Sequence, residues 1–291
     1  MAGHIAIGTS SWADPGFVEE WYPEGLPARE RLGYYAERFE AVEVNSTFYA
    51  IPSPQTAARW AKVTPEAFSF DVKLHRLLSR HAAGPSSLPK DLRARARTNE
   101  RGRVKLTKRL EAAMADRLLE AVASLGGKLS TFLLQLTPAF GPRDHKLDEL
   151  APLVERLGQA APVSVELRNR FWVDESRLER TLGWFEDHGA VFVSVDAPQG
   201  SKAPTIMPPI DAVTHPDVGY LRAHGRNLEG YLRGRSVAER FGYRYDDDEL
   251  RDLGGRAQEL AGKAREVRLM FNNNRGADAP EAAARLRELL S

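Results

Sequence analysis

The sequence predicts a TIM (β/α)₈ barrel, and three observations support this fold class. Eight short runs rich in β-branched and aromatic residues follow one another along the 291 residues, and stretches with the 3.6-residue period of an amphipathic helix separate most of them. Strand and helix alternating eight times within about 250 residues is typical of this barrel. No G-x-G-x-x-G motif follows the first run, which disfavours the alternative of a doubly wound open sheet. We expect a single domain over residues 1–291.

Each predicted strand is a short apolar run, and each predicted helix follows or precedes such a run. The strands are expected at residues 4–8, 41–45, 68–73, 131–136, 163–168, 190–196, 218–224 and 266–272. The clearest helical patterns lie at residues 29–38, 110–125, 147–159, 175–188, 247–264 and 279–290. Asp174 suits the N-cap of the helix that follows it, and Gly189 suits the end of the same helix.

Two segments interrupt the alternation. Residues 84–107 follow the third strand as an insertion, and between Asp91 and Arg109 the chain has eight Lys and Arg but only two Asp and Glu. Residues 197–217 follow the sixth strand and contain five prolines, which exclude a regular helix there. In barrels, the loops that follow strands build the functional site, so both segments are expected on the functional rim.

The composition excludes several classes of protein. Forty-one Lys and Arg against 40 Asp and Glu give a net charge of +1, which excludes an overall basic nucleic-acid coat but not a local basic patch. The absence of cysteine excludes disulfides, thiolate metal sites and cysteine nucleophiles. No apolar stretch approaches the roughly 20 residues of a membrane helix, and the N-terminus lacks a signal-peptide pattern. We therefore expect a cytoplasmic protein that does not bind membranes.

Polar side chains gather at the C-terminal ends of the predicted strands. Side chains two residues apart share one face of a strand, and the apolar residues between them suit the outer face that packs on helices. The polar set is therefore expected to point into the barrel mouth. The catalytic candidates are Glu43, Lys73, His75, Glu166 and Asp196. The expected substrate-binding residues are Trp12, Asn45, Arg168, Arg222, His224, Arg226 and Asn273.

Buried charges at such a rim either pair with one another or serve a function, because an unpaired buried charge costs several kcal/mol. Structural salt bridges would be Glu166–Arg168, Glu43–Lys73 and Asp196–Arg222. Charge concentrated at one rim favours a functional site, so we expect one pocket formed by Glu43, Lys73, His75, Glu166, Arg168, Asp196, Arg222 and His224. Within it, Arg168 and Arg222 are expected to bind an anionic group. The histidines outside this set, including His81, are expected to be solvated.

Specific motifs run from the first predicted strand to the last. They are GTSSW at residues 8–12, VEVNSTFY at 42–49, FDVK at 70–73, VELR at 165–168, YLRAHGR at 220–226 and FNNN at 271–274. With these motifs the chain resembles the DUF72 (YecE-like) family, whose members adopt a TIM-barrel fold and whose biochemical role is largely unassigned. The resemblance implies the fold and supplies no reaction. The chain departs from the family pattern in its long basic insertion, and in Ser79-Arg80-His81, where a Thr-His pair is expected.

The first function class that fits is an enzyme with its site at the C-terminal mouth, acting on a phosphorylated or nucleic-acid-related substrate, with hydrolysis as one candidate reaction. A carboxylate would act as base and Lys73 or His75 as acid, while arginines hold the anionic group. The cofactor is unknown, since no nucleotide-cofactor motif is present. A divalent metal on the mouth carboxylates and histidines is an open alternative, although the interleaved cations oppose it.

The second function class is a nucleic-acid- or polyanion-binding barrel without catalysis. The basic segment 91–109 and the aromatic residues Trp12, Tyr49 and Trp172 after strands support it. The same basic segment is also consistent with a merely solvated loop. The expected ligand is therefore a small anion or a nucleic acid, and the sequence indicates no protein partner.

Overall fold

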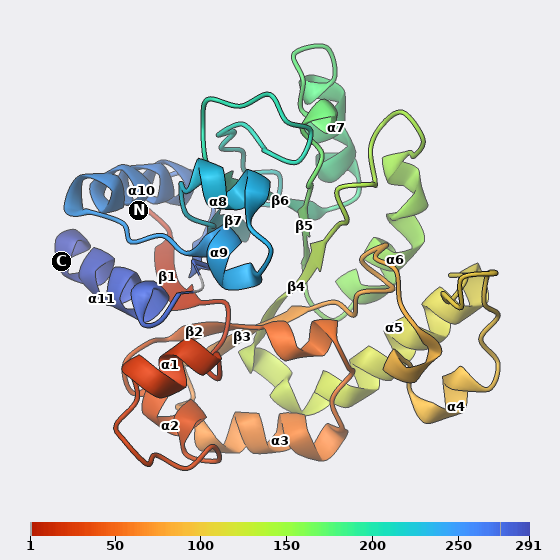
Figure 1. The fold of residues 1–291 in the computed structure, drawn as a ribbon, viewed down its shortest axis with the longest axis horizontal. Coiled ribbons are helices and arrows are strands. Elements are labelled where there is room, and N and C mark those ends of the chain that lie inside the picture. The colour runs from red at the N-terminus through yellow and green to blue at the C-terminus, as the bar shows by residue number, and fades with distance from the viewer. Residues whose placement is uncertain (1, 274) are drawn as a thin grey trace.

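Eight parallel strands close into one barrel in the computed structural model, which describes residues 2–273 and 275–291 (Figure 1). Each strand pairs with the next in the sequence, and the last strand closes the barrel against the first. The predicted single-domain α/β barrel is therefore confirmed. The strands are β1 (His4–Thr9), β2 (Ala41–Val44), β3 (Ser69–Lys73), β4 (Leu129–Gln135), β5 (Val163–Glu166), β6 (Ala190–Asp196), β7 (Val218–Ala223) and β8 (Glu266–Phe271).

Helices follow the strands and surround the barrel (Figure 1). The helices are α1 (Pro15–Glu20), α2 (Arg31–Ala36), α3 (Pro54–Val63), α4 (Lys90–Arg93), α5 (Lys108–Val122), α6 (Ala151–Gly158), α7 (Leu178–Asp187), α8 (Leu228–Arg233), α9 (Val237–Phe241), α10 (Asp247–Ala261) and α11 (Asp278–Leu290). All six helical patterns correspond to helices with shifted ends, whereas the shorter α1, α4, α8 and α9 and the amphipathic α3 were not predicted.

The structure contradicts the predicted start of α7 and agrees with its predicted end. Asp174 does not cap this helix, because its carboxylate accepts a hydrogen bond from the Ser176 hydroxyl at 2.8 Å and α7 begins only at Leu178. The N-cap prediction is therefore wrong. Gly189 has a φ of +58°, the left-handed conformation that ends a helix without a Cβ penalty, so its place at the end of α7 is as predicted.

The strand register decides which side chains fill the barrel. Residues paired side by side in neighbouring strands point to the same face of the sheet. Glu43 is paired with Asp71, and Tyr220 of β7 reaches the Asp71 carboxylate across the barrel at 2.9 Å, so this row points inward. The alternate residues, such as Val42 and Val72, are fully buried in the hydrophobic core.

The two interruptions of the alternation also appear in the structure. Residues 197–217 contain neither helix nor strand, as the five prolines predict. The insertion after β3 holds α4 and a small antiparallel bridge between Thr98 and Val104. Asn272 and Asn273 follow β8, whereas Asn274 lies outside the described residues. In the part of the chain that the structure describes, no helix is both long and apolar enough to cross a membrane.

Candidate functional site

A buried ion pair occupies the middle of the barrel. The Arg268 guanidinium contacts both carboxylate oxygens of Asp71, at 3.2 and 2.9 Å, and the Tyr220 hydroxyl donates to the same carboxylate at 2.9 Å. All three side chains are buried. Burial raises the pKa of Asp71 to about 6, although Arg268 and Tyr220 oppose this rise. This layer fills the barrel and supports the polar layer above it.

Arg222 joins two carboxylates in the next layer toward the C-terminal ends of the strands. Its Nε and Nη2 donate to the two oxygens of Glu43 at 2.8 and 2.6 Å, and its Nη1 donates to Glu166. The Nη2 also lies 3.4 Å from the Ser10 hydroxyl. Burial by itself would lower the pKa of Arg222, but the two carboxylates outweigh burial and raise it further above its usual value.

Glu166 accepts hydrogen bonds from several side chains at once. Gln135 Nε2 lies 3.0 Å from both carboxylate oxygens, and Arg168 Nη1 lies 3.4 Å from one of them. Burial opposes ionisation of Glu166, but Arg222 and the hydrogen bond from His224 outweigh burial and hold its pKa well below the usual range. Glu166 is therefore a charged anchor rather than a proton acceptor.

His224 is held as a neutral imidazole between Glu166 and Asn272. Burial lowers the pKa of His224, although Glu166 opposes the change. Its Nε2 lies 3.0 Å from Glu166 Oε1, and its Nδ1 lies 2.9 Å from Asn272 Nδ2. Since the amide nitrogen donates and the carboxylate accepts, the network assigns the proton to Nε2. His224 is thus fixed in one tautomer.

Cationic side chains form the rim above this layer. Lys73 Nζ and the Arg76 guanidinium lie 5.0 and 5.7 Å from the centre of the Phe48 ring, and the His81 ring packs edge-on against the same ring at 5.1 Å. Burial lowers the pKa of His81, and Lys73, Arg76 and Arg168 lower it further. We call Lys73, Arg76 and Arg168 the cationic rim, and His81 lies beside it.

The charges of this region do not balance. Four cations, Lys73, Arg76, Arg168 and Arg222, face two carboxylates, Glu43 and Glu166, so two positive charges are in excess. Both carboxylates pair with arginine, while neither Lys73 nor Arg76 forms an ion pair with any residue that the structure describes. Burial, with a further contribution from Arg222, lowers the pKa of Lys73 to about 8. The arrangement favours an anionic ligand.

Helices α8 and α9 cover one side of the cationic rim. The Tyr231 hydroxyl accepts a hydrogen bond from Arg168 Nη2 at 2.6 Å and donates to the Thr205 carbonyl at 3.1 Å. The Phe241 ring lies 5.7 Å from the Tyr231 ring and 5.8 Å from that of His224. We call residues 228–241 the α8–α9 cover.

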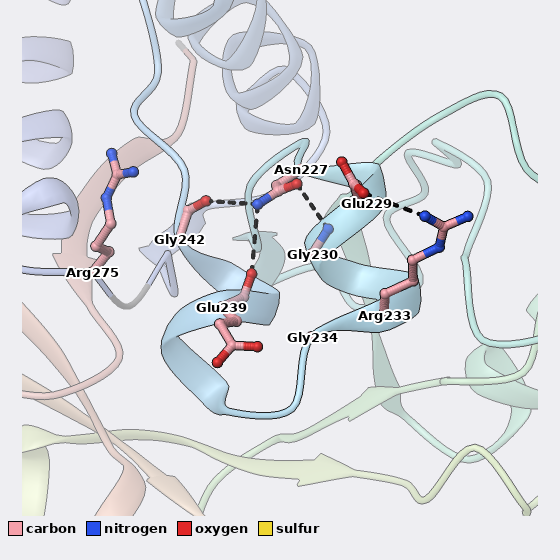
Figure 2. A pocket seen from close by; sticks show the side chains of 8 residues that line it. All are labelled: Asn227, Glu229, Gly230, Arg233, Gly234, Glu239, Gly242 and Arg275. Carbon is pink, nitrogen blue, oxygen red and sulfur yellow. Dashed lines mark hydrogen bonds and ion pairs between the residues drawn. The ribbon is translucent and has the colours of Figure 1, made fainter.

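An open cavity of about 540 Å³ lies against the α8–α9 cover, with Arg275 also lining it (Figure 2). Figure 2 shows how Asn227 joins the two helices: its Oδ1 accepts from the Gly230 N–H at 2.9 Å, and its Nδ2 donates to the carbonyls of Gly242 and Glu239 at 3.2 and 3.5 Å. Glu229 pairs with Arg233 at 3.4 Å on the same helix. The charged residues that line the cavity thus pair mostly with other residues of the α8–α9 cover.

The structure brings six of the eight residues expected in one pocket into contact or close range, and places the other two elsewhere. The six are Glu43, Lys73, Glu166, Arg168, Arg222 and His224. The two that lie elsewhere are Asp196 and His75.

Asp196 belongs to a separate cluster on the helix-facing side of β6. Its carboxylate accepts from Arg226 at 2.8 Å, from Arg256 of α10 at 3.1 Å and from the Tyr245 hydroxyl at 2.8 Å. The register explains this position, because Val195, not Asp196, is paired with the inward-pointing Arg222. The assumption that the polar face of every strand points inward is therefore wrong for β6. Arg226 pairs with Asp196 and so also lies outside the barrel mouth.

His75 is buried near Arg76, and its ring contacts the backbone rather than the carboxylate layer. Its Nδ1 accepts from the Leu77 N–H at 3.2 Å, and burial lowers its pKa to about 4. Among the described residues, no hydrogen bond joins His75 to Glu43 or Glu166. His75 is therefore not placed to act on a ligand held by the carboxylate layer.

The remaining binding candidates have local roles. Trp12 packs edge-on against Trp60 at 5.5 Å, and Asn273 donates to the Tyr243 carbonyl at 2.8 Å. The side-chain oxygens of Asn45 and Asn273 are buried and accept no hydrogen bond from the described residues. Together with His75 Nε2, Arg76 Nε and His81 Nε2, which also lack a partner among the described residues, these oxygens remain available to a ligand or a water molecule.

The expectation that Arg222 binds a free anion is wrong. Its side chain is 0% exposed, and its donors are taken by Glu43, Glu166 and Ser10. The predicted pair Asp196–Arg222 does not form, because the two side chains lie on opposite faces of the sheet. The divalent-metal alternative finds no support in the geometry, since no three His, Asp or Glu of the described residues are grouped to hold an ion.

Sequence reasoning did not include Arg76, His81 or Tyr231 among the site residues, although it placed Arg76 near the functional rim. His81 was expected to be solvated, but it is half-buried and its Nε2 is a buried atom without a partner among the described residues. The one available signal was the family resemblance, which implies a histidine near this position. Tyr231 carried no signal, because the α8–α9 cover was not predicted.

Comparison with known proteins identifies the family. Residues 6–291 match the family described as "Protein of unknown function DUF72". The UPF0759 protein YunF of Bacillus subtilis (strain 168) is 29% identical over 292 residues, which cover 98% of this chain and 94% of YunF. The UPF0759 protein YecE of Escherichia coli (strain K12) is 26% identical over 178 residues, which cover 61% of this chain and 53% of YecE.

Solved structures agree with this match. A DUF72 family protein from Enterococcus faecalis V583 has a TM-score of 0.77 at 27% identity, over 98% of this chain and 95% of that one. A DUF72 family protein from Thermotoga maritima MSB8 has a TM-score of 0.74 at 25% identity, over 99% of each chain. None of these descriptions names a reaction. Because the match spans nearly the whole sequence, this chain belongs to the DUF72 family.

Proposed function

We propose that the C-terminal mouth binds a small phosphorylated or nucleic-acid-related molecule and that the protein is an enzyme acting on it. The observation that carries this proposal is the excess of positive charge at the cationic rim. Lys73 and Arg76 have no acidic partner among the described residues, and only an anion from outside would balance them. Phosphate suits the site because guanidinium and ammonium groups bind its oxygens directly.

Arg168 and Lys73 are the groups that we expect to contact the ligand. The Arg168 side chain is 13% exposed, and its Nη2 now donates to the Tyr231 hydroxyl. A phosphate oxygen would take the place of that hydroxyl oxygen, since both are acceptors. Lys73 belongs to the same rim, close enough for Arg168 to help lower its pKa, and its Nζ forms no hydrogen bond with the described residues. The positive charge of the buried Arg222 would attract the ligand electrostatically without contacting it.

Lys73 is the acid–base candidate. A group transfers protons most effectively when its pKa lies near the working pH, and the pKa of Lys73 is lowered to about 8. In hydrolysis of a phosphate ester, water would attack phosphorus as the bond from phosphorus to the alcohol oxygen breaks. The Lys73 ammonium would protonate the departing alcohol oxygen, and the proton released by the water would return Lys73 to its ammonium form. The carboxylates Glu43 and Glu166 serve to hold Arg222 in this proposal, because their oxygens already accept hydrogen bonds from it.

Calorimetric titration with inorganic phosphate tests the binding step. Lys73→Gln and Arg168→Gln should each weaken phosphate binding by about 1–3 kcal/mol, the range for a hydrogen bond to a charged group. Lys62→Gln removes an exposed lysine on α3 and should leave binding unchanged. Undiminished affinity in both rim variants would refute the anion site. Release of phosphate from a panel of phosphorylated sugars and nucleotides, absent in Lys73→Gln, would establish the hydrolytic reaction.

A further inference from the structure

Hydrogen bonds within the insertion after β3 fix its backbone, and with it the positions from which its cationic side chains extend. Asn99 Oδ1 accepts from the N–H groups of Arg101 and Arg103, each at 3.0 Å, and Gly102 has a φ of +67° at the tip of this turn. The Lys105 N–H donates to the Arg97 carbonyl at 2.8 Å. The segment is therefore a small hairpin rather than a featureless loop.

The hairpin is fastened to the rest of the protein through its other face. Val104 is buried, and its N–H donates to the Ala83 carbonyl at 2.9 Å. Leu92 of α4 is also buried, and α4 lies beside α5 at the edge of the molecule, away from the α8–α9 cover (Figure 1). This apolar attachment leaves the charged side chains of the hairpin in solvent.

Four cations line one cavity of about 350 Å³ between the hairpin and the first turns of α5. Because Thr98 is bridged to Val104 in antiparallel register, Arg97 and Lys105 extend from neighbouring positions of the hairpin. No acidic side chain lines the cavity. The lining residues are Leu92, Arg95, Arg97, Lys105, Thr107, Arg109, Leu110 and Ala113.

Crowding of like charges destabilises a folded protein through self-repulsion. The acids near this cavity are already engaged: Asp91 pairs with Arg117 at 2.6 Å, and Glu111 pairs with Arg80 at 2.5 Å. Within the described residues, none of the four cavity cations forms an ion pair. An anion bound in the cavity would relieve this repulsion, so the cavity is suited to an anionic occupant.

From these contacts we infer that the insertion and the start of α5 form a second binding site, separate from the mouth, for a single-stranded nucleic acid. The cations continue past the cavity to Arg101 and Arg103 at the hairpin tip, which suits a row of phosphates better than one phosphate. Leu92 and Leu110 give the cavity an apolar floor, and exposed guanidinium groups stack on bases. The backbone lies along the hairpin, and one base enters the cavity.

Fluorescence anisotropy with a labelled oligodeoxythymidine of about 12 nucleotides, near the upper site size of a single-strand binding fold, tests this inference. For single strands the slope of log affinity against log salt is about −0.7 per neutralised phosphate. The double variant Arg97→Gln/Lys105→Gln should therefore make the slope shallower by about 1.4 and weaken binding at low salt. Both side chains are exposed, and their loss reduces the repulsion among the cavity cations, so the variant should melt no lower than the wild type.

A matched control removes the same charge elsewhere. Arg59→Gln/Lys62→Gln lies on the exposed face of α3 and should keep the wild-type slope. Lys73→Gln should also keep it, which distinguishes this site from the one proposed at the mouth. An unchanged slope in Arg97→Gln/Lys105→Gln would overturn the inference. Equal competition by inorganic polyphosphate and by an oligonucleotide of the same charge would overturn nucleic acid as the occupant.

Discussion

Arg222 of β7 and Glu43 of β2 form a two-point ion pair across the interior of the barrel. The Nε and Nη2 of Arg222 lie 2.8 and 2.6 Å from the two oxygens of Glu43, and both side chains are completely buried. Parallel, bidentate contacts fix the guanidinium plane as well as its position. The pair therefore forms a rigid charged floor beneath the more exposed Lys73 and Arg168.

Removal of Arg222 is expected to be strongly destabilising. Arg222→Met leaves Glu43 and Glu166 buried without their main counter-charge, and breaking a buried pair in this way costs about 3–5 kcal/mol. Urea denaturation measures the loss in the free energy of unfolding. Adding Glu43→Gln to the variant should recover part of it, because one uncompensated charge is then gone.

Arg251→Met provides the control for this measurement. Arg251 is exposed and pairs with Asp248 on the surface of α10 at 2.6 Å, and such pairs contribute about 0–1 kcal/mol. If Arg222→Met proved as mild as Arg251→Met, the buried pair would have no structural role.

Phosphate binding should weaken as the pH rises through about 8. Burial lowers the pKa of Lys73 to about 8, so the ammonium form that attracts an anion predominates below that pH and is lost above it. Calorimetric titrations between about pH 7 and 9 bracket this pKa and measure the effect. In Lys73→Arg the guanidinium stays charged, so its phosphate affinity should not fall over the same interval. Parallel pH profiles for the two proteins would contradict the assignment.

The fold was predictable because strand periodicity and helix periodicity are local properties of the sequence. The orientation of each strand was less predictable, as β6 illustrates. Its inward row is Val191, Val193 and Val195 by register with neighbouring strands, so an apolar row fills the barrel and the polar Asp196 faces the helices. Alternation of residues defines two faces, but only the register with neighbouring strands decides which face points inward.

The composition of the site was likewise only partly predictable. Strand-end positions identified Glu43, Glu166 and Arg222, because their strands deliver them to one end of the barrel. The partners of Arg222 were not predictable, since Glu43 is 179 positions away in the sequence and pairs with it only when the barrel closes. His81 and Tyr231 reach the rim from loops and a short helix, whose paths depend on tertiary contacts.

Asp196 is expected to be important for stability and unimportant for anion binding. Its carboxylate holds Arg226, Arg256 and Tyr245 together outside the barrel wall. Asp196→Asn removes a carboxylate that two arginines share, while Arg226 keeps Asp252 and Arg256 keeps Asp211 as partners. The loss in the free energy of unfolding should therefore be about 1.5–3 kcal/mol, the range for hydrogen bonds to a charged group. Phosphate affinity, measured well below the melting temperature, should equal that of the wild type. A loss of phosphate affinity without a loss of stability would show that Asp196 belongs to the anion-binding site after all.

The last prediction concerns the stability of the protein in mild acid. His75 is buried with its pKa lowered to about 4, whereas a histidine in the unfolded chain has a pKa of about 6.5. Between these values the unfolded state binds the proton more readily, so the contribution of His75 to stability is lost progressively as the pH falls below about 6.5. From pH 6.5 to 5 the loss amounts to about 1.6 kcal/mol, because the slope is only about half of 1.36 kcal/mol per pH unit at pH 6.5 and approaches that value at lower pH. Asp71, whose pKa is raised to about 6, changes stability in the opposite direction and partly conceals this loss in the wild type.

The variant His75→Gln isolates the effect of His75, because Asp71 titrates identically in both proteins and cancels from the difference. The glutamine oxygen can still accept from the Leu77 N–H, as Nδ1 of His75 does at 3.2 Å, but it takes up no proton in this range. Urea denaturation at pH 6.5 and at pH 5 should therefore show the wild type losing about 1.6 kcal/mol relative to the variant. Equal changes in the two proteins would mean that the pKa of His75 is the same in the folded and unfolded states, which its burial and its accepting hydrogen bond both oppose.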